Sequence, residues 1–432
     1  MNAPLAPMRV ALLGHGTVGG SLRRLLHEHR DHVRLATGRD VEICAVLVRD
    51  PERHRLDVGE ALAPLLTESL DVVLASKPDV VCEAMGGLEP TRGYLLQVLG
   101  AGIPVVTANK QLVARHGTEL FARAAEAGAQ LRFEASVCGA VPIVRMLRES
   151  LAATRIERLL GILNGTTNYM LSKMEATGAT YDDALAEAQE LGYAEPDPTE
   201  DVEGLDAAAK LAILAGIAFG TTIDFDSVRA TGISGVRATD VAHAAELGCR
   251  IRLIGRAERL TADDESTSVL LDVTPMLVPI AHPLATIVGA TNAVLVDGEP
   301  FGRLVVQGAG AGGPETASAL AGDLVSVMGS EPSFLTNDPH VATLPIAPAD
   351  ARRDRHYVRM QVVDQPGVLA TVAGALAALD ISIERVLQQR ADDGEQAVLV
   401  LTTHPCTPGA LTTALAGVAS TDRTVLPMLD LA

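Results

Sequence analysis

The sequence predicts an α/β fold in three parts: a doubly wound parallel sheet, then a mixed α+β domain, then a small unit with the order βαββαβ. Three observations predict this division. Short apolar runs alternate with helical patterns up to residue 140, longer mixed segments follow, and a Pro- and charge-rich stretch at 345–355 precedes a third pattern. A length of 432 residues suits a few domains of roughly 100–200 residues each.

The first part, residues 1–140, carries the alternation that is typical of a parallel sheet covered by helices on both faces. Its predicted strands are 9–14, 41–48, 79–83 and 104–107, and its predicted helices include 18–28, 91–101 and 117–127. Residues 308–328 form a glycine-rich turn followed by a long helical pattern. We expect the segment 308–345 to return to the first part and complete it.

The remaining parts follow with different patterns. The middle part, 141–307, has predicted strands at 156–163, 269–273 and 293–296 and predicted helices at 181–191 and 202–219. A linker at 346–355 leads to the last part, 356–432. Its predicted strands are 357–363, 381–388, 397–403 and 424–427, its helices are 368–379 and 408–418, and a turn is expected at 391–396. This order predicts a ferredoxin-like unit.

Composition excludes several classes of protein. A net charge of −19 repels phosphate backbones, so we expect no nucleic-acid partner. No apolar run reaches the roughly 18–20 residues of a membrane span, and the first residues lack the pattern of a signal peptide. The five cysteines are scattered and form no CxxC pair, which is typical of reduced thiols. We therefore expect a cytoplasmic protein that does not bind membranes.

A glycine motif, Gly14-His-Gly16-Thr-Val-Gly19, joins the first predicted strand to the first helix. In that position Gly14 permits a tight turn, Gly16 lets the backbone approach a pyrophosphate, and Gly19 lets the helix pack on the strand. The phosphates would bind at the helix N-terminus. The pattern predicts a Rossmann dinucleotide-binding domain, although a plain glycine turn in another α/β protein has the same spacing.

The residue after the second strand bears on the choice of cofactor. An NAD-binding enzyme usually has an acidic residue there for the ribose hydroxyls. Here Arg49 stands at this place with Arg53 nearby, which favours a 2′-phosphate and hence NADP(H) over NAD(H). The alternative is that both arginines are solvated loop residues.

Two lysines are candidates for chemistry. Lys110 follows the fourth strand, at the sheet edge where ligands of open α/β sheets bind. Asp206 and Lys210 are four residues apart and share a helix face, beside an apolar run that should be buried. Burial would move the pKa of Lys210 toward neutrality and nearby carboxylates would hold it charged, so the direction stays open. The alternative is a routine surface pair.

A polar loop, Asn164-Gly165-Thr166-Thr-Asn-Tyr, follows the predicted strand 156–163. Its density of hydrogen-bonding side chains favours a binding loop, and the alternative is a turn with a helix N-cap.

Taken together, these motifs resemble homoserine dehydrogenase over nearly the whole chain. The matching segments are, in order, GHGTVG, TANK, EASVCGAVP, NGTTNYML, GYAEPDP, DVEGLDAAAK and GAGAG. The resemblance implies reversible oxidation of L-homoserine to L-aspartate 4-semialdehyde by NADP(H) or NAD(H), in the biosynthesis of threonine and methionine. Other readings are an oxidoreductase for another amino acid and a nucleotide sensor without turnover.

The resemblance also implies roles for the residues of these motifs. Lys210 exchanges the proton at the reacting oxygen, and Lys110 assists at that oxygen and at the cofactor. The residues implied to bind the amino acid are Glu195, Asp201, Asp206, Asn164, Gly165 and Thr166. Thr17 and Val18 contact the cofactor diphosphate with the glycine motif, and Gly312 closes over the cofactor.

A monovalent cation, usually sodium, is a further property that the resemblance implies. The matching positions are Glu134, Val137, Gly139 and Val141, and the carbonyl oxygens that they offer are hard ligands. Cys138 lies among them. A cysteine nucleophile would suggest an acyl-transfer enzyme similar to aspartate-semialdehyde dehydrogenase, but no His stands beside it, so we expect a structural role.

The last part resembles an ACT domain. Asp364-Gln-Pro-Gly367-Val-Leu matches the loop between its first strand and first helix, where small amino acids bind. We expect L-threonine to bind there as an inhibitor, and the alternative is a dimerisation module without a ligand. The resemblance also implies a homodimer or a higher homo-oligomer, formed through the middle domain.

Overall fold

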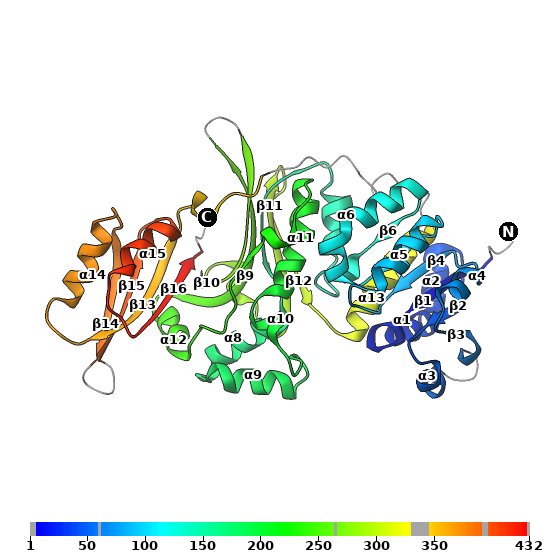
Figure 1. Cartoon of the computed structure of the whole chain (residues 1–432), viewed down its shortest axis with the longest axis horizontal. Coiled ribbons are helices and arrows are strands. Elements are labelled where there is room, and N and C mark those ends of the chain that lie inside the picture. Colours follow the sequence, from blue (N-terminus) through cyan, green and yellow to red (C-terminus); the bar gives the residue numbers. More distant parts are fainter. Residues whose placement is uncertain (1–5, 59–61, 263–265, 330–344, 391–395, 430–432) are drawn as a thin grey trace.

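Three parts follow one another along an elongated molecule, from the N-terminal sheet to the C-terminal unit (Figure 1). The computed structural model describes residues 6–58, 62–262, 266–329, 345–390 and 396–429. Within these ranges, no helix is both long and apolar enough to cross a membrane.

The first sheet is parallel throughout and has the order β3-β2-β1-β4-β5-β6. Its strands are β1 Met8–Leu13, β2 Val41–Leu47, β3 Leu66–Thr67, β4 Val80–Glu83, β5 Val105–Thr107 and β6 Leu131–Arg132. This order is that of the dinucleotide-binding Rossmann fold, so the predicted doubly wound sheet is confirmed. The structure adds β3 and β6, which are too short to give a sequence pattern.

Helices cover both faces of this sheet. The helices are α1 Thr17–Glu28, α2 Arg30–Thr37, α3 Pro51–Val58, α4 Leu70–Ala75, α5 Thr91–Gly100, α6 Lys110–Ala127 and α13 Gly313–Gly329. Successive residues of β1 point to opposite faces: Leu12 packs in one apolar cluster with Leu22 and Leu320, and Leu13 packs in another with Leu95. Helix α13 lies against α1, although the chain has passed through the middle part in between.

The middle part is built on long, mostly antiparallel strands in the order β12-β11-β7-β9-β10. They are β7 Arg155–Ile162, β9 Cys249–Thr261, β10 Thr267–Pro279, β11 Thr291–Glu299 and β12 Gly302–Ala309, with short β8 Arg229–Ala230 beside β10. Its α-helices are α7 Ile143–Arg145, α8 Gly165–Thr177, α9 Tyr181–Glu190, α10 Thr199–Val202, α11 Leu205–Phe219 and α12 Ala238–Glu246. Helix α11 packs on β7, β9 and β10 and also on α6 of the first part.

Several predicted elements of the middle part differ from the observed ones. The predicted strands 269–273 and 293–296 are only the centres of β10 and β11, and β9 and β12 were not predicted. Strand β9 buries Arg252 and Arg256, whose partners lie elsewhere in the chain, so it lacks an apolar pattern. The predicted helix 202–219 is interrupted at Gly204, whose φ of 79° separates α10 from α11. Helix α6 begins at Lys110, well before the predicted residue 117.

The last part has the predicted ferredoxin-like fold, with strand order β16-β13-β15-β14. Its elements are β13 Arg355–Val363, α14 Val368–Ala377, β14 Ile383–Arg390, β15 Gln396–Thr403, α15 Pro408–Ala416 and β16 Asp422–Met428. Most of the predicted turn 391–396, like the end of the expected returning segment at 330–344, lies outside the described residues. Strand β16 pairs with β10 at Met428 and Leu277, so the last two parts share one continuous sheet.

Buried polar side chains hold the last part against the middle part. Asp240 on α12 accepts hydrogen bonds from the Tyr357 hydroxyl (3.1 Å) and the Arg359 guanidinium, both on β13. Arg359 also donates to Asp422 (2.6 Å), and Nδ1 of His243 lies 3.2 Å from the Tyr357 hydroxyl oxygen. We call this group the joint cluster. The preceding segment is also anchored, because Ile346 pairs with Val269 of β10.

Candidate active site

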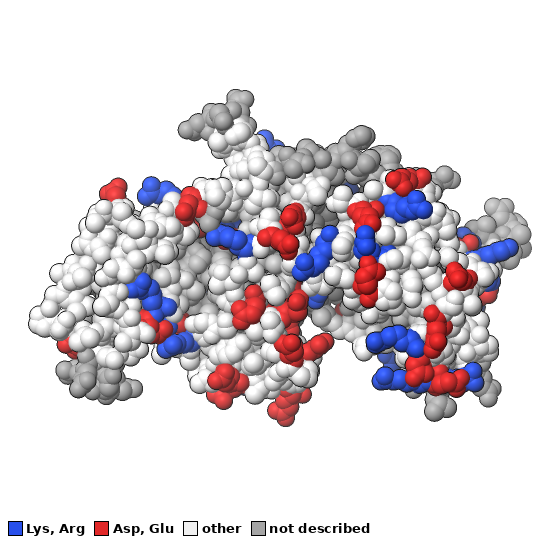
Figure 2. All heavy atoms as spheres, in the orientation of Figure 1, with Lys and Arg blue, Asp and Glu red and all other residues white. Residues whose placement is uncertain are grey.

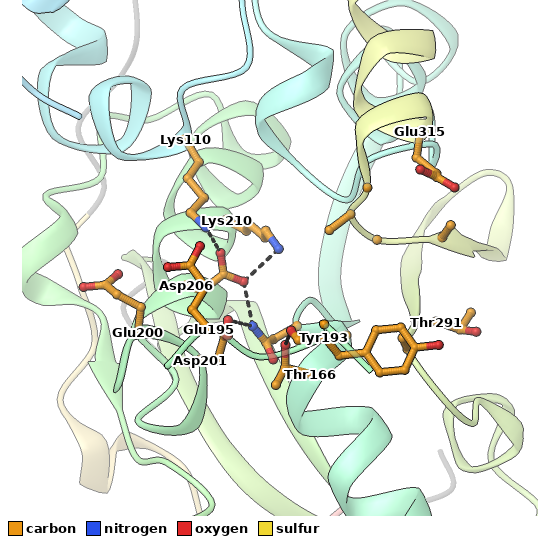
Figure 3. Close-up of a pocket in the computed structure, with 18 of the residues that line it drawn as sticks. Lys110, Thr166, Tyr193, Glu195, Glu200, Asp201, Asp206, Lys210, Thr291 and Glu315 are labelled. Carbon is orange, nitrogen blue, oxygen red and sulfur yellow. Dashed lines mark hydrogen bonds and ion pairs between the residues drawn. The ribbon is translucent and has the colours of Figure 1, made fainter. Parts of the chain in front are cut away.

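A cleft of about 1480 Å³ opens between the first and middle parts. Its walls come from the start of α6, the start of α8, the segments 191–201, 286–291 and 307–312, and helix α11 (Figure 3). Acidic side chains gather over α9 and α10 beside it (Figure 2). The cleft therefore combines the carboxyl edge of the parallel sheet with a strongly acidic wall.

Two lysines from different parts of the fold meet on one carboxylate at the floor of this cleft. Asp206 and Lys210 lie one turn apart on α11, and Lys210 Nζ donates to Asp206 Oδ2 at 2.8 Å. Lys110, the first residue of α6, donates to the other carboxylate oxygen (Figure 3). Asp206 is only 2% exposed and Lys210 only 7%. We call these three residues the cleft cluster.

Asn164 extends the cleft cluster toward the second acid. It is the N-cap of α8, since its Oδ1 accepts the Thr167 N–H at 2.8 Å. Its Nδ2 donates to Asp206 Oδ2 at 2.9 Å and to Asp201 Oδ1 at 2.6 Å. The structure therefore confirms the N-cap, and the other end of the same amide contacts two carboxylates that line the cleft.

The next two residues fix the wall of the cleft. A Cβ on Gly165 would lie 2.8 Å from the carbonyl oxygen of Ala290, so only glycine lets α8 approach the segment 286–291 this closely. Thr166 Oγ1 donates to the Tyr193 carbonyl at 2.6 Å, which connects the start of α8 to the segment 191–201.

Burial and charge act in opposite directions on the cleft cluster. Burial by itself would raise the pKa of Asp206, but the two lysine charges outweigh it and hold that pKa below its ordinary value. Burial would likewise lower the pKa of Lys210, but Asp206 raises it above the ordinary 10.5. The sequence left the direction of this pKa shift open; the shift is upward, so Lys210 is a charged ammonium at neutral pH.

The acids around the cluster differ in their environment. Burial, and then the charge of Asp206, raise the pKa of Asp201. Glu195 and Glu200 are exposed and line the cleft on the same side as Asp206 (Figure 3). Glu200 accepts a hydrogen bond from Gln111 Nε2 (2.9 Å), which is a second contact between the two walls. These acids line the cleft without forming an ion pair with either lysine, both of which pair with Asp206.

The glycine motif has the geometry that a diphosphate requires. Gly14 has a φ of 98°, and a Cβ there would lie 2.7 Å from the carbonyl oxygen of Ala84. A Cβ on Gly19 would lie 2.2 Å from the carbonyl oxygen of Gly14. Around Gly16, in contrast, a Cβ would meet nothing within 4 Å, and α1 begins at Thr17 without a side-chain cap. The N–H groups at the start of α1 are therefore open to an anion.

The glycine motif does not itself line the cleft. The loop between β12 and α13, residues 310–312, connects the two, and we call it the returning loop. Gly312 (φ 131°) lies on the cleft wall, and a Cβ on Gly313 would lie 2.9 Å from Thr17 Cγ2. A ligand on Thr17 and Val18 could thus extend past Gly312 into the cleft. Arg49 is exposed at the end of β2, with Asp50 capping the following helix through the Arg53 N–H (3.1 Å).

The segment with the proposed cation ligands forms a buried turn. Cys138 and Gly139 are consecutive residues with positive φ (58° and 51°). The carbonyl oxygens of Val137 and Gly139 accept no hydrogen bond from any residue in the described ranges. The Glu134 carboxylate instead accepts the Val144 and Arg145 N–H groups at 2.8 and 2.7 Å, and burial raises its pKa to about 7.

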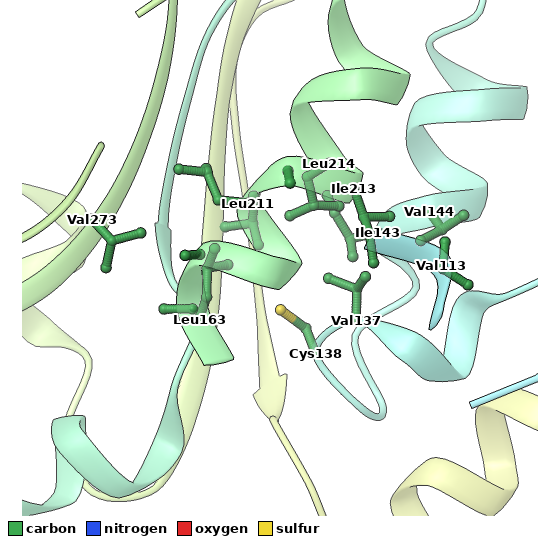
Figure 4. Close-up of a cluster of buried hydrophobic side chains, with 14 of the residues drawn as sticks. Val113, Val137, Cys138, Ile143, Val144, Leu163, Leu211, Ile213, Leu214 and Val273 are labelled. Atoms are coloured by element: carbon green, nitrogen blue, oxygen red, sulfur yellow. The ribbon is translucent and has the colours of Figure 1, made fainter. Parts of the chain in front are cut away.

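Cys138 has the environment of a structural residue. Its side chain lies in the apolar cluster with Val137 and Leu163 (Figure 4), and only 1% of the residue is exposed. Burial raises the pKa of the thiol to about 11. A thiol this strongly protonated is a poor nucleophile, so the geometry favours the structural interpretation.

The sequence did not single out some residues that line the cleft. Gln111 and Arg115 follow Lys110 on α6 and contact Glu200 and the Phe225 ring, respectively. The segment 286–291 has no chemical motif and is held in place by Asn168, whose Nδ2 donates to the Gly289 carbonyl at 2.9 Å. The dense polar loop at 164–169 was the only signal for that contact.

Comparison with known proteins gives consistent results along the whole chain. Models described as "Homoserine dehydrogenase, NAD binding domain", "Homoserine dehydrogenase" and "ACT domain" match residues 14–134, 142–325 and 356–418. A homoserine dehydrogenase of Mycobacterium tuberculosis is 44% identical over 415 residues, which cover 94% of this chain and 92% of the relative.

Solved structures agree with these matches. A homoserine dehydrogenase from Thiobacillus denitrificans has a TM-score of 0.90 at 41% identity and covers 99% of both chains. A hyperthermophilic archaeal homoserine dehydrogenase in complex with NADPH has a TM-score of 0.62 at 26% identity, covering 75% of this chain and 98% of the other.

Proposed function

The chain belongs to the homoserine dehydrogenase family, and from that premise we propose which side chains perform the reaction. The protein is an NAD(P)-dependent oxidoreductase of amino-acid biosynthesis that carries a C-terminal ACT domain. The reaction interconverts L-homoserine and L-aspartate 4-semialdehyde. One observation carries the assignment of residues: Lys110 and Lys210 meet on Asp206 at the floor of the cleft.

Lys210 is the proposed proton carrier. In aldehyde reduction its ammonium gives a proton to the carbonyl oxygen, and in homoserine oxidation the neutral amine takes the hydroxyl proton. The bound nicotinamide supplies or accepts the hydride at the carbon of the same group. Because Asp206 raises the pKa of Lys210, the donor form is already present at neutral pH. Lys110, which pairs with the same carboxylate, directs a second donor toward the reacting oxygen.

The acidic wall is proposed to hold the amino acid. Asp206 is already occupied by two lysines and Asn164, so it chiefly orients the lysines and supports the ammonium group from a distance. Glu195 and Asp201 then take the larger share of the ammonium charge. Asn164, Gly165 and Thr166 form the adjoining wall, and this arrangement supplies proximity between substrate and cofactor.

NADP(H) is the proposed cofactor, with NAD(H) as the weaker alternative. Gly14, Gly16 and Gly19 with the N–H groups of Thr17 and Val18 would hold the diphosphate, and Gly312 would cover it. Arg49 is exposed at the end of β2 and could reach a 2′-phosphate. The archaeal relative in complex with NADPH supports this choice.

A monovalent cation, most simply sodium, is proposed at the turn 134–141. Two buried carbonyls there, of Val137 and Gly139, accept no hydrogen bond from the described residues and suit a hard cation. Glu134 and Val141 complete the proposed set. A Cβ on Gly139 would lie 2.8 Å from the Gly310 carbonyl carbon, so an ion here would stiffen the wall that carries the returning loop.

Regulation, assembly and location are proposed from the same family membership. L-threonine is the proposed inhibitor, bound at the loop 364–369 of the ACT domain, where Gly367 (φ 93°) starts α14. A homodimer or higher homo-oligomer and a cytoplasmic location follow the family pattern. All five cysteines are free and buried, in keeping with a reducing compartment.

One assay series tests these proposals. Purified full-length protein is supplied with L-homoserine and either NADP⁺ or NAD⁺, with and without sodium and L-threonine. We expect homoserine-dependent cofactor reduction, a higher kcat/KM with NADP⁺, a loss of rate when potassium-free, sodium-free buffer replaces sodium, and inhibition by threonine. Equal rates with other amino acids, or no turnover at all, would contradict the proposed reaction and favour the alternative oxidoreductase or the sensor.

A further inference from the structure

A buried asparagine behind the floor of the cleft shares a hydrogen-bond acceptor with Lys210. The carbonyl oxygen of Leu163 accepts Lys210 Nζ at 2.7 Å and Asn292 Nδ2 at 3.0 Å. Asn292 is fully buried and is not among the residues that line the cleft. It therefore lies behind the cleft wall, yet its amide contacts the same carbonyl as Lys210 Nζ.

Sheet topology explains why these groups converge. Strand β11 runs antiparallel to both of its neighbours, so its start lies beside their ends. Asn292 stands opposite Gly308 of β12, and its neighbour Ala293 stands opposite Ile162 of β7. Leu163 follows β7 directly. One residue at the start of β11 thus lies between the backbone that Lys210 contacts and the strand that leads into the returning loop.

The returning loop is packed against the same side chain. A Cβ on Gly310 would lie 2.2 Å from Asn292 Oδ1, so glycine is required for this approach. Gly310 itself lines the cleft, together with Gly312. Asn292 is therefore wedged between the Leu163 carbonyl on one side and the wall of the cleft on the other.

The amide of Asn292 has two polar neighbours, the Leu163 carbonyl and the Cys138 thiol. Its Oδ1 is buried and has no hydrogen-bond partner among the described residues, which costs free energy. The Leu163 carbonyl already has a donor in Lys210, so it does not need the amide to be satisfied. An apolar side chain of similar volume would avoid the unpaired oxygen.

We propose that Asn292 is a positioning residue for Lys210. Its amide fixes the Leu163 carbonyl, and that carbonyl together with Asp206 holds the ammonium in one orientation toward the reacting oxygen. Without the amide, the carbonyl can rotate and Lys210 loses its fixed direction, although Asp206 still keeps it charged. The inference rests on the proposed role of Lys210 in homoserine dehydrogenation.

The test replaces the amide by an apolar group of similar size. For Asn292→Leu we expect kcat per folded enzyme to fall about 10- to 100-fold in both directions, because small displacements of reacting groups have effects of this order. KM for homoserine and for NADP⁺ should stay within about threefold. Asn292→Ala, which adds no atoms to the site, should show the same split if the leucine variant fails to fold.

Asn168→Leu is the matched control. Asn168 is equally buried and also has an unpaired Oδ1, and its Nδ2 donates to the carbonyls of Ile287, Gly289 and Thr291, not to Leu163. Its replacement should lower the melting temperature as much and change KM through the wall 286–291, with a loss of kcat per folded enzyme well below that of Asn292→Leu.

The outcomes distinguish a failure of the positioning role of Asn292 from a failure of the proposed role of Lys210. If both asparagine variants lose kcat equally, or if Asn292→Leu and Asn292→Ala keep kcat within threefold of the unmodified enzyme, Asn292 has no positioning role. If instead Lys210→Ala retains kcat, the proposed proton carrier is wrong, and the inference fails with it for that separate reason.

Discussion

Two buried charge clusters in this molecule each surround one aspartate with several hydrogen-bond donors, but only one of them borders a cavity that a ligand can enter. In each, an aspartate that is at most 2% exposed receives several donors: Asp206 in the cleft cluster and Asp240 in the joint cluster. The cleft cluster uses lysines and borders an open cavity, and the joint cluster uses Arg359 and is enclosed between α12 and β13. Lysine can release a proton near physiological pH when its surroundings permit, and arginine effectively cannot.

This difference shows that a buried ion pair by itself does not indicate catalysis. Both aspartates are buried and each is paired closely with a cation. Access for a substrate and a cation that can change its protonation state distinguish the cleft cluster. The joint cluster has neither, so we expect it to stabilise the ACT domain against the middle domain and to take no part in the reaction.

The largest effect is expected when Lys210, the proposed proton carrier of the cleft cluster, is removed. Lys210→Ala should lower kcat in both directions by about 10²- to 10⁴-fold, as is usual for the loss of a general acid and base. Lys210→Arg keeps a positive charge beside Asp206 but should lose nearly as much, because a guanidinium does not release its proton. Steady-state kinetics with homoserine and with the semialdehyde measure both. Substantial kcat in the arginine variant would contradict the distinction between the clusters.

The second prediction breaks the joint cluster. Arg359→Ala leaves Asp240 buried without its main partner, which should cost about 3 kcal/mol of stability. Thermal unfolding should show the loss in the transition of the ACT domain, and kcat without threonine should stay within about twofold.

Arg355→Ala is the control for that prediction. Arg355 lies on the same strand, and it pairs with Glu384 at the partly exposed edge of the sheet. Exposed pairs of this kind contribute less than about 1 kcal/mol. Equal destabilisation by the two substitutions would show that burial of the joint cluster is not what stabilises the domain.

The third prediction concerns the pH dependence of the reaction, which should report the pairing of Lys210 with Asp206 in the cleft cluster. Since Asp206 raises the pKa of Lys210 above 10.5, kcat/KM for homoserine oxidation should rise with pH and reach no plateau below that value. Semialdehyde reduction, which needs the charged form, should be flat around neutral pH. In Asp206→Asn the carboxylate is gone and burial dominates, so the midpoint for oxidation should move to lower pH. A midpoint that is unchanged in the variant would exclude Asp206 as its cause.

The two clusters also show how far sequence reasoning reaches. Lys210 and Asp206 share a helix face four residues apart, so their pairing was predictable from spacing. Lys110 lies 96 residues away from Asp206, and only the resemblance to a family implied that it works beside Lys210 at the reacting oxygen. The joint cluster was not predicted, because Asp240 and Arg359 lie on elements 119 residues apart and neither stands in a motif.

The fold follows the same rule. The first sheet was predicted almost completely because strand, glycine turn and helix are local signals. The middle sheet was underestimated because β9 buries arginines whose partners come from β10, α8 and the segment before β13. Asn292 had no signal at all, since a single polar residue at the start of an apolar strand becomes important only when three strand ends meet.

The smallest effect is expected when a lysine replaces Arg359 in the joint cluster. Arg359 donates through separate nitrogens to Asp240, Asp422 and Thr424, a set that one lysine ammonium on a shorter side chain cannot reach in full. Arg359→Lys keeps the charge beside Asp240, so it should lose only about 1 kcal/mol, well below the alanine variant. Thermal unfolding of the two variants side by side measures the difference. If lysine proves as damaging as alanine, the geometry of the fork matters more in the joint cluster than the neutralisation of Asp240.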